Sequence, residues 1–267
     1  MITFPNAKIN IGLNIIARRP DGYHDLETVF YPIKINDVLE VVEADKLSFE
    51  SSGLAIPGTM EDNLCIKGYH LLKKDHDLPP VKIFLEKNIP IGAGLGGGSA
   101  DAGFFIKLMS DKFGLELSDD RMEEYARMLG ADCASFIRNK PVFAFEKGDE
   151  FEPINLDLSA YKIVLVMPDE HVSTAEAYRG VKPAAVRDSL YDLVKTPLTA
   201  WRGQIKNDFE AHIFHDHPVI RGVKAELYEH GAIYASMSGS GASVFGIFET
   251  LPDLGNMKEN YQVFENV

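Results

Sequence analysis

The residues from Pro90 to Asp101 form the stretch of this chain that is best suited to chemistry. Five glycines fall within the seven positions from 92 to 98. Glycine lets the backbone adopt positive φ and leaves no Cβ between the main-chain amides and a ligand. The stretch follows a strand-like run, Val81 to Leu85, and precedes a helix-like run, Ala102 to Phe113. A loop that opens a helix offers several N–H donors and the positive end of the helix dipole, so it predicts a site for nucleotide phosphates.

Two familiar nucleotide patterns fit this glycine run only in part. Gly92, Gly94 and Gly97 have the spacing of the dinucleotide fingerprint, but the run lies in mid-chain, and residues 114–120 read as a loop and a helix start. The fingerprint requires an acidic residue at the end of the following strand. The spacing of Gly92 and Gly97 also fits a P-loop, yet Gly98 stands where a P-loop requires lysine. A glycine-rich hairpin without a ligand is disfavoured, because so many glycines carry a large entropic cost.

Two further positions carry candidates for catalysis. The strand-like segment from Ala7 to Ala17 is mostly apolar but contains Lys8 and Asn10, which strand alternation places on one face. Asp132 follows Gly130-Ala131, and a carboxylate within hydrogen-bond reach of a substrate hydroxyl can accept its proton during attack on phosphorus. A solvated strand lysine and a carboxylate that caps a helix end remain the alternatives for Lys8 and Asp132.

Strands and helices mix along the chain without a repeat of fixed period, which predicts an α+β fold with two lobes. A polar, turn-prone segment from Gly148 to Pro153 divides the expected domains, 1–152 and 153–267. Segment 183–203 and the residues beyond Glu249 give no assignable pattern. The expected strands are 7–17, 27–33, 38–43, 46–49, 81–85, 142–145, 163–167, 233–237 and 242–248. The expected helices are 63–74 with Asp62 as its cap, 102–113, 119–129 with Ser118 as its cap, 174–178, 207–215 and 218–229.

Composition narrows the class of protein. The chain has 267 residues, 45% of them hydrophobic, and a formal net charge of −13, which disfavours a general nucleic-acid binder. Cys65 and Cys133 are too few for a disulfide framework or a metal cluster and fit a reducing cytoplasm. Cys133 reads as a small buried apolar residue. Neither a signal peptide nor a membrane span is visible, so we expect a cytoplasmic protein with a small-molecule partner and no nucleic acid or membrane.

The glycine stretch Pro-x-Gly-x-Gly-Leu-Gly-Gly-Gly-Ser-Ala-Asp resembles the phosphate loop of the GHMP kinases, the superfamily of galactokinase, homoserine kinase and mevalonate kinase. Further motifs are Ala7-Lys8-Ile9-Asn10-Ile11, Asp21-Gly22-Tyr23-His24, Gly130-Ala131-Asp132 and Met237-Ser238-Gly239-Ser240-Gly241-Ala242. Taken in this order they resemble the branch that acts on cytidine diphosphate methylerythritol, in the non-mevalonate isoprenoid pathway. The resemblance runs from about Lys8 to Phe248, and Asp-Gly-Tyr-His is its most specific part.

The resemblance implies the two-lobed GHMP kinase fold, with an N-terminal lobe like domain 2 of ribosomal protein S5 and a ferredoxin-like C-terminal lobe. It also implies an ATP-dependent kinase that phosphorylates the 2-hydroxyl of its substrate, with Mg²⁺ as a further cofactor. Lys8 and Asp132 then become the catalytic pair, and Ser99 a candidate metal ligand. The residues that would bind ATP are Asn63, near the adenine, and Pro90, Ile91, Gly92, Ala93, Gly94, Leu95, Gly96, Gly97, Gly98, Ser99 and Ala100.

The same resemblance assigns the cytidine site. Tyr23 would stack on the cytosine, His24 would hydrogen-bond its ring, and Tyr178 would cover the opposite face. The remaining substrate-binding candidates are Asn10, Ser240 and Gly241, the last two closing over phosphates. A half-buried aromatic, a satisfied core histidine and a plain tight turn are the alternatives for these groups.

One departure from the family pattern concerns the candidate base. The family often has Gly-Ala-Asp-x-Pro, whereas this chain reads Gly130-Ala131-Asp132-Cys133-Ala134. Without proline the backbone at 134 is free in φ, so we expect a less rigid loop there. Two other functions stay open: a GHMP kinase with a different alcohol acceptor, and a nucleotide-binding regulator without catalysis. The sequence gives neither the oligomeric state nor the metal ligands.

Overall fold

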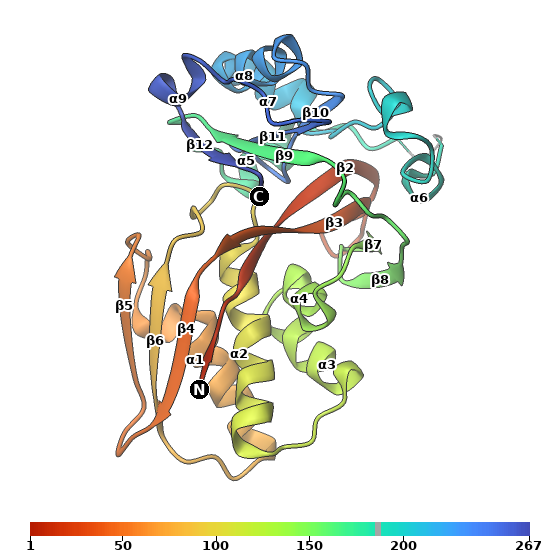
Figure 1. The fold of residues 1–267 in the computed structure, drawn as a ribbon. Helices are drawn as coiled ribbons and strands as arrows, with labels where there is room; N and C mark the ends of the chain where they lie inside the picture. The colour runs from red at the N-terminus through yellow and green to blue at the C-terminus, as the bar shows by residue number, and fades with distance from the viewer. Residues whose placement is uncertain (185–187) are drawn as a thin grey trace. The chain divides into compact units, whose positions relative to one another are not determined.

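The computed structural model describes residues 1–184 and 188–267 and has the expected α+β fold (Figure 1). The chain forms two compact units, each assembled from several segments. The first unit contains Met1–Lys8, Pro32–Ile91 and Gly96–Lys140, and the second contains Ile9–Tyr31, Gly92–Leu95 and Pro141–Val267. The division into residues 1–152 and 153–267 stays a prediction.

The first unit contains a four-stranded sheet in the order β1–β4–β6–β5. The strand β6 (Val81–Lys87) alternates between buried and more exposed residues, as the sequence predicts, and it leads into the glycine stretch. Helices α1 and α2 lie against this sheet in Figure 1, with α3 beside α2. The other elements of this unit are β1 (Ile2–Thr3), β4 (Val38–Glu43), β5 (Ser48–Gly53), α1 (Leu64–Asp75), α2 (Gly97–Phe113), α3 (Asp119–Leu129) and α4 (Ser135–Arg138), with 3₁₀ turns at 60–62 and 131–134.

The second unit contains an antiparallel sheet in the order β10–β11–β9–β12. With strands numbered along the chain this order is 2-3-1-4, which is the ferredoxin-like arrangement expected for the C-terminal lobe. Helix α8 packs against β10 and β11, and its first residue is Pro218, a position where proline costs no hydrogen bond. These elements are β9 (Lys162–Met167), α5 (Thr174–Gly180), α6 (Leu190–Leu193), α7 (Glu210–Asp216), α8 (Pro218–Glu229), β10 (Tyr234–Met237), β11 (Val244–Phe248), α9 (Met257–Asn260) and β12 (Gln262–Glu265), with a 3₁₀ turn at 198–200.

A third sheet has the order β2–β3–β7–β8. Its strands are β2 (Asn6–Arg18), β3 (His24–Asn36), β7 (Val142–Phe145) and β8 (Glu150–Pro153). Most of β2 is buried, so its polar residues lie in a largely apolar layer. Among the described residues, none of the helices is both long and apolar enough to cross a membrane.

The structure corrects two sequence expectations and gives the elements of two segments to which the sequence assigns none. Asn63, not Asp62, caps α1: its Oδ1 accepts a hydrogen bond from the Cys65 N–H at 2.9 Å. The residues from 150 to 153 form the edge strand β8 instead of a turn, because Phe151 packs against Phe30 of β3. Segment 183–203, left unassigned, contains α6 and a 3₁₀ turn, and its residues 185–187 lie outside the described residues. The residues beyond 249 contain α9 and β12.

Candidate active site

The two candidate catalytic residues meet in the first unit. Lys8 lies near the start of β2, and Asp132 lies in the 3₁₀ turn at 131–134 that follows α3. The Lys8 Nζ is 3.3 Å from the Asp132 Oδ2, and the two side chains are 5% and 35% exposed. A nearly buried ammonium therefore faces a carboxylate that solvent, or a substrate, can reach.

Helix α2 begins directly beside this ion pair. Gly96 caps the helix at φ +69, and a Cβ added to it would lie only 3.0 Å from the Lys8 Cε and 3.1 Å from the Phe136 Cζ. The glycine therefore lets the helix start approach the lysine stem closely. The first N–H groups of a helix have no partner within the helix, so α2 presents donors and a partial positive charge next to the lysine–aspartate pair.

Ser99 lies in the first turn of α2, close to the Cys133 thiol. Burial raises the pKa of Cys133 to about 12, and the nearby Ser99 hydroxyl offsets part of this rise. Cys133 thus stays a protonated, buried thiol, as the sequence suggested. The contact brings Ser99 next to the segment that carries Asp132, so two oxygen ligands of the kind that Mg²⁺ prefers lie on neighbouring elements. Among the described residues, no group of three or more His, Cys, Asp or Glu side chains could hold a metal by itself.

The backbone after Asp132 has helical geometry at the position where the family often has proline. Ala134 has φ −67 and ψ −28, and a proline would set the same φ. The Ser135 hydroxyl donates to the Asp132 carbonyl at 2.8 Å. Residue 134 therefore has the φ that proline would impose, and the expectation of a less rigid loop stays a prediction.

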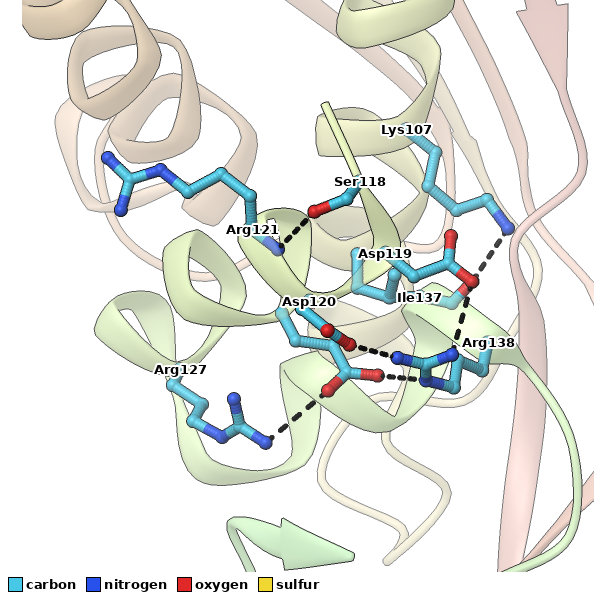
Figure 2. Close-up of polar contacts among 9 residues, drawn as sticks. Lys107, Ser118, Asp119, Asp120, Arg121, Arg127, Ile137 and Arg138 are labelled. Atoms are coloured by element: carbon cyan, nitrogen blue, oxygen red, sulfur yellow. Dashed lines mark hydrogen bonds and ion pairs between the residues drawn. The ribbon is translucent and has the colours of Figure 1, made fainter. Parts of the chain in front are cut away.

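Charged side chains hold α4 from the outside (Figure 2). The Arg138 Nε donates to the Glu123 Oε1 at 2.7 Å, and its Nη1 lies 3.4 Å from the Asp119 Oδ2. The Lys107 Nζ donates to the Ile137 carbonyl at 2.6 Å. Because Arg138 is 45% exposed, these ion pairs add little stability, about 0–1 kcal/mol each. The buried Phe136 and Ile137 anchor the segment.

The middle of the glycine stretch belongs to the second unit, where two serines hold it. The Ser238 hydroxyl donates to the Gly94 carbonyl at 2.9 Å and accepts from the Asn10 N–H at 3.1 Å. The Ser243 hydroxyl donates to the Ala93 carbonyl at 2.6 Å. A Cβ on Gly94, which has φ +76, would lie 1.9 Å from the Ser238 carbonyl oxygen. Only glycine fits there, so the motif near the C-terminus shapes the stretch.

The remaining residues predicted to bind phosphate lie in the same turns or at the start of α2. Gly92 and Gly96 share the positive φ of Gly94, at +70 and +69. Pro90 and Ile91 precede these turns, Leu95 is buried, and Gly97, Gly98 and Ala100 lie in the first turns of α2. Ser240 and Gly241 form a tight turn in which the Gly241 N–H donates to the Ser238 carbonyl at 2.9 Å.

Asn207 is a site residue that the sequence did not reveal. Its side-chain nitrogen donates to the Met237 carbonyl at 2.9 Å and to the Gly239 carbonyl at 2.8 Å. These bonds fix the turn that holds the glycine stretch. Its only sequence signal was an asparagine at the expected start of a helix, which does not reveal a partner 30 residues away.

The candidate cytidine residues are only partly assembled. The rings of His24 and Tyr178 stack at 4.9 Å with an interplanar angle of 26°, and Tyr178 meets Phe209 edge-on. Tyr23, in contrast, is 65% exposed, and the Lys147 Nζ lies 5.7 Å from the centroid of its ring. Burial, with the nearby Arg18, lowers the pKa of His24, so its ring is neutral near pH 7. A neutral imidazole offers one donor and one acceptor.

Two further candidates have structural partners. The Asn10 side-chain nitrogen donates to the Thr28 hydroxyl at 2.9 Å, and the residue is 3% exposed. Asn63 uses its side-chain oxygen as the α1 cap. The turn that carries Tyr23 is tied by Arg19, whose Nη1 lies 2.5 Å from the Asp25 Oδ1 and 2.6 Å from the Glu146 Oε2.

Comparison with known proteins identifies the family. The chain matches the family models described as GHMP kinases N terminal domain, at residues 63–140, and GHMP kinases C terminal, at residues 200–264. It is 54% identical to a 4-diphosphocytidyl-2-C-methyl-D-erythritol kinase of Bacteroides fragilis over 93% of this chain and 92% of the relative. A protein of the same name from Bacteroides thetaiotaomicron is 54% identical over 95% of each chain.

A solved structure agrees with this result. The crystal structure of a 4-(cytidine 5'-diphospho)-2C-methyl-D-erythritol kinase is 28% identical to this chain, with a TM-score of 0.83 over 99% of this chain and 98% of the other. The chain belongs to the 4-diphosphocytidyl-2-C-methyl-D-erythritol kinase family of the GHMP kinases.

Proposed function

We propose that this protein is an ATP-dependent kinase that transfers the γ-phosphoryl group to the 2-hydroxyl of 4-diphosphocytidyl-2-C-methyl-D-erythritol, in the non-mevalonate isoprenoid pathway. The observation that carries the mechanism is the Lys8–Asp132 pair, 3.3 Å apart, beside the first turn of α2. The names of the relatives support the choice of substrate.

In the proposed reaction, a carboxylate oxygen of Asp132 accepts the proton of the 2-hydroxyl as the hydroxyl oxygen bonds to the γ-phosphorus. The bond from that phosphorus to the bridging β-phosphate oxygen breaks, and ADP leaves. The Lys8 ammonium holds the carboxylate in place and lies close enough to orient the same hydroxyl. General-base catalysis of this kind is worth about 10²- to 10⁴-fold in rate. Most of the acceleration therefore comes from positioning, and from the N–H donors of the glycine stretch that stabilise charge on the phosphates.

We propose that the residues of the glycine stretch, Pro90 to Ala100, bind the triphosphate and that Asn63 lies near the adenine. Mg²⁺ would neutralise charge on the phosphate oxygens. The donor set fits this ion, since Ser99 lies close to Cys133, the neighbour of Asp132, and both Ser99 and Asp132 offer oxygen ligands. Ser99 remains the candidate ligand, with the ATP phosphates supplying the others.

For the cytidine, we propose that the neutral His24 ring hydrogen-bonds the base and that Tyr178 stacks on it. His24 and Tyr178 now stack on each other, so Tyr178 would have to move off the His24 ring to cover the face of the base. The exposed Tyr23 supplies the second aromatic surface. Asn10, Ser240 and Gly241 are the remaining proposed substrate contacts.

A substrate panel tests the proposal. ADP release is measured with 4-diphosphocytidyl-2-C-methyl-D-erythritol, free methylerythritol phosphate, mevalonate and homoserine. Turnover restricted to the cytidyl compound is the expected result. Equal or better turnover of mevalonate or homoserine would indicate a GHMP kinase with another acceptor. Nucleotide binding with no turnover of any acceptor would indicate a regulator.

Two variants test the assigned roles. Asp132→Asn is expected to bind both ligands but to lower kcat about 10²-fold or more. His24→Ala is expected to raise the Kd of the cytidyl substrate much more than that of ATP, and an equal loss for both would remove the cytosine assignment. Free, buried thiols at Cys65 and Cys133 suit a reducing compartment, so we also propose a cytoplasmic location.

A further inference from the structure

Three charged residues form a buried cluster where the chain enters and leaves the glycine stretch. Lys87 is the last residue of β6, Asp37 lies between β3 and β4, and Asp101 lies in the second turn of α2. All three belong to the first unit, and their side chains are 3%, 0% and 6% exposed. Charged residues are almost never buried to this degree without a partner, so the cluster calls for an explanation.

On the entry side, Asp37 binds the backbone. Its Oδ1 accepts from the Asn88 N–H at 2.6 Å and from the Ile89 N–H at 2.8 Å. Its Oδ2 accepts from the Lys87 ammonium. One carboxylate therefore fixes the two residues that lead from β6 into the glycine stretch.

On the exit side, Lys87 reaches the start of α2. Its Nζ donates to the Asp101 Oδ2 at 2.7 Å. A Cβ added to Gly97, the first residue of α2, would lie 2.9 Å from the same Nζ. The ammonium thus lies against the first helical residue, on the turn whose N–H groups face the proposed phosphate site.

We propose that Lys87 is a positioning residue for ATP: together with Asp37 and Asp101 it fixes the two ends of the glycine stretch relative to each other. This inference rests on the proposed function, in which the amides at the start of α2 bind the triphosphate. Lys87 itself is covered by Gly97 and acts through the backbone that it holds.

Stability alone is a weaker explanation of the cluster. Burial raises the pKa of Asp101 to about 7, with the Lys87 ammonium offsetting part of the rise, so the buried charge is costly. Replacing buried ion clusters with apolar residues is often neutral or stabilising. Apolar residues could not accept hydrogen bonds from the Asn88 and Ile89 N–H groups. The charged side chains hold the backbone at both ends of the glycine stretch in one orientation.

Lys87→Met and Leu85→Ala form a matched pair for the test. Both positions lie on the same buried face of β6, with Leu85 1% exposed, but only Lys87 contacts the ends of the stretch. Binding of the nonhydrolysable analogue AMPPNP with Mg²⁺ is measured by calorimetry, well below both Tm values. Lys87→Met is expected to raise the Kd of the analogue about tenfold or more. Leu85→Ala is expected to lower Tm while leaving that Kd within about twofold of the parent.

Asp101→Asn covers the case in which Lys87→Met does not fold. An amide keeps the shape and an acceptor for Lys87 but loses the charge, so we expect a smaller rise in the Kd of AMPPNP, about threefold. In steady-state assays, both cluster variants should raise the KM for ATP and leave the KM for the cytidyl substrate within twofold.

Two results would overturn the inference: an unchanged Kd for AMPPNP in the cluster variants, or an equal rise in Leu85→Ala. Because analogue binding needs no turnover, it tests the cluster separately from the choice of acceptor. A parent protein that binds AMPPNP but phosphorylates no cytidyl compound would refute the proposed function and leave the role of Lys87 standing.

Discussion

Single methyl groups added to the glycine stretch distinguish glycines required by the fold from glycines required by the ligand. Gly94→Ala places a Cβ 1.9 Å from the Ser238 carbonyl oxygen, whereas real Cβ contacts are essentially never shorter than 3.0 Å. The backbone must move, and an L-residue at φ +76 adds about 1–2 kcal/mol of strain. We expect a fall in the free energy of unfolding of at least about 2 kcal/mol, together with weaker ATP binding.

Gly98→Ala should behave in the opposite way. Among the described residues, no atom outside the local helix backbone and the adjacent residues lies within 4 Å of a Cβ added there, and the residue lies in the first turn of α2. Alanine in a helix is better than glycine by about 0.5–1 kcal/mol, so the variant should be slightly more stable than the parent. If the triphosphate packs against this turn, the methyl group occupies its place, and we expect the KM for ATP to rise at least about tenfold, or 1.4 kcal/mol.

Gly222→Ala is the control for this pair. Gly222 lies in α8, and in the part of the chain that the structure describes no atom beyond the local helix backbone and the adjacent residues lies within 4 Å of an added Cβ. Gly222→Ala should therefore gain similar stability without a change in the KM for ATP. Thermal unfolding and ADP-release kinetics on the three variants give both quantities. An unchanged KM for ATP in Gly98→Ala would refute the assignment of the phosphates to the start of α2.

Three further predictions concern other contacts. His217 Nδ1 and Nε2 lie 2.8 Å and 3.1 Å from carboxylate oxygens of Glu170 and Glu176, whose hydrogen bonds raise the pKa of His217. The stabilisation of the folded state by protonated His217 should be complete below about pH 6.5 and lost as pH rises through the raised pKa of the folded state. The free energies of urea unfolding of the parent and of His217→Gln should therefore converge at high pH. A constant difference between them across the pH range would contradict this prediction. Ala134→Pro should keep the activity and raise the free energy of unfolding by about 0.5 kcal/mol, since φ already fits; lower stability in thermal unfolding would show that the N–H at 134 is needed. Ser238→Ala should cost about 1–3 kcal/mol in urea unfolding, because the buried Asn10 N–H and the half-buried Gly94 carbonyl lose their hydrogen bond to the hydroxyl, and a change below about 0.5 kcal/mol would mean that water replaces it.

Local signals predicted the elements well where they were complete. Helix α8 begins at Pro218 and ends at Glu229, as expected, because proline and the periodic apolar residues mark both its start and its course. The Ser118 cap of α3 is confirmed: its hydroxyl accepts from the Arg121 N–H. At α1, two adjacent residues could both cap a helix, and the local sequence does not say which backbone is extended. The prediction of a turn at β8 was wrong because the charged residues of this segment suit a turn. The partner of Phe151 lies beside it only in the folded sheet.

The site was predictable as residue types and not as contacts. Lys8 and Asp132 were chosen from separate motifs, and their 3.3 Å separation depends on how β2 and the segment after α3 fold together. The serines that hold the glycine stretch lie about 150 residues away, as in the Ser243–Ala93 bond, and no local pattern reveals such pairings. The sequence did not single out Lys87, because its burial arises only when Asp37 and Asp101 are brought around it.

The last strand of the chain has a consequence for how this protein can be shortened or fused. Strand β12 runs antiparallel to β9, from the Gln262–Met167 pair to the Glu265–Val164 pair. A chain cut after Glu249 would leave one side of β9 with bare N–H and C=O groups beside apolar side chains. Such an exposed strand edge can pair with a strand of a second molecule, which is a route to aggregates. The C-terminal stretch, which has no recognisable motif, thus covers the edge of the sheet that β9 would otherwise expose.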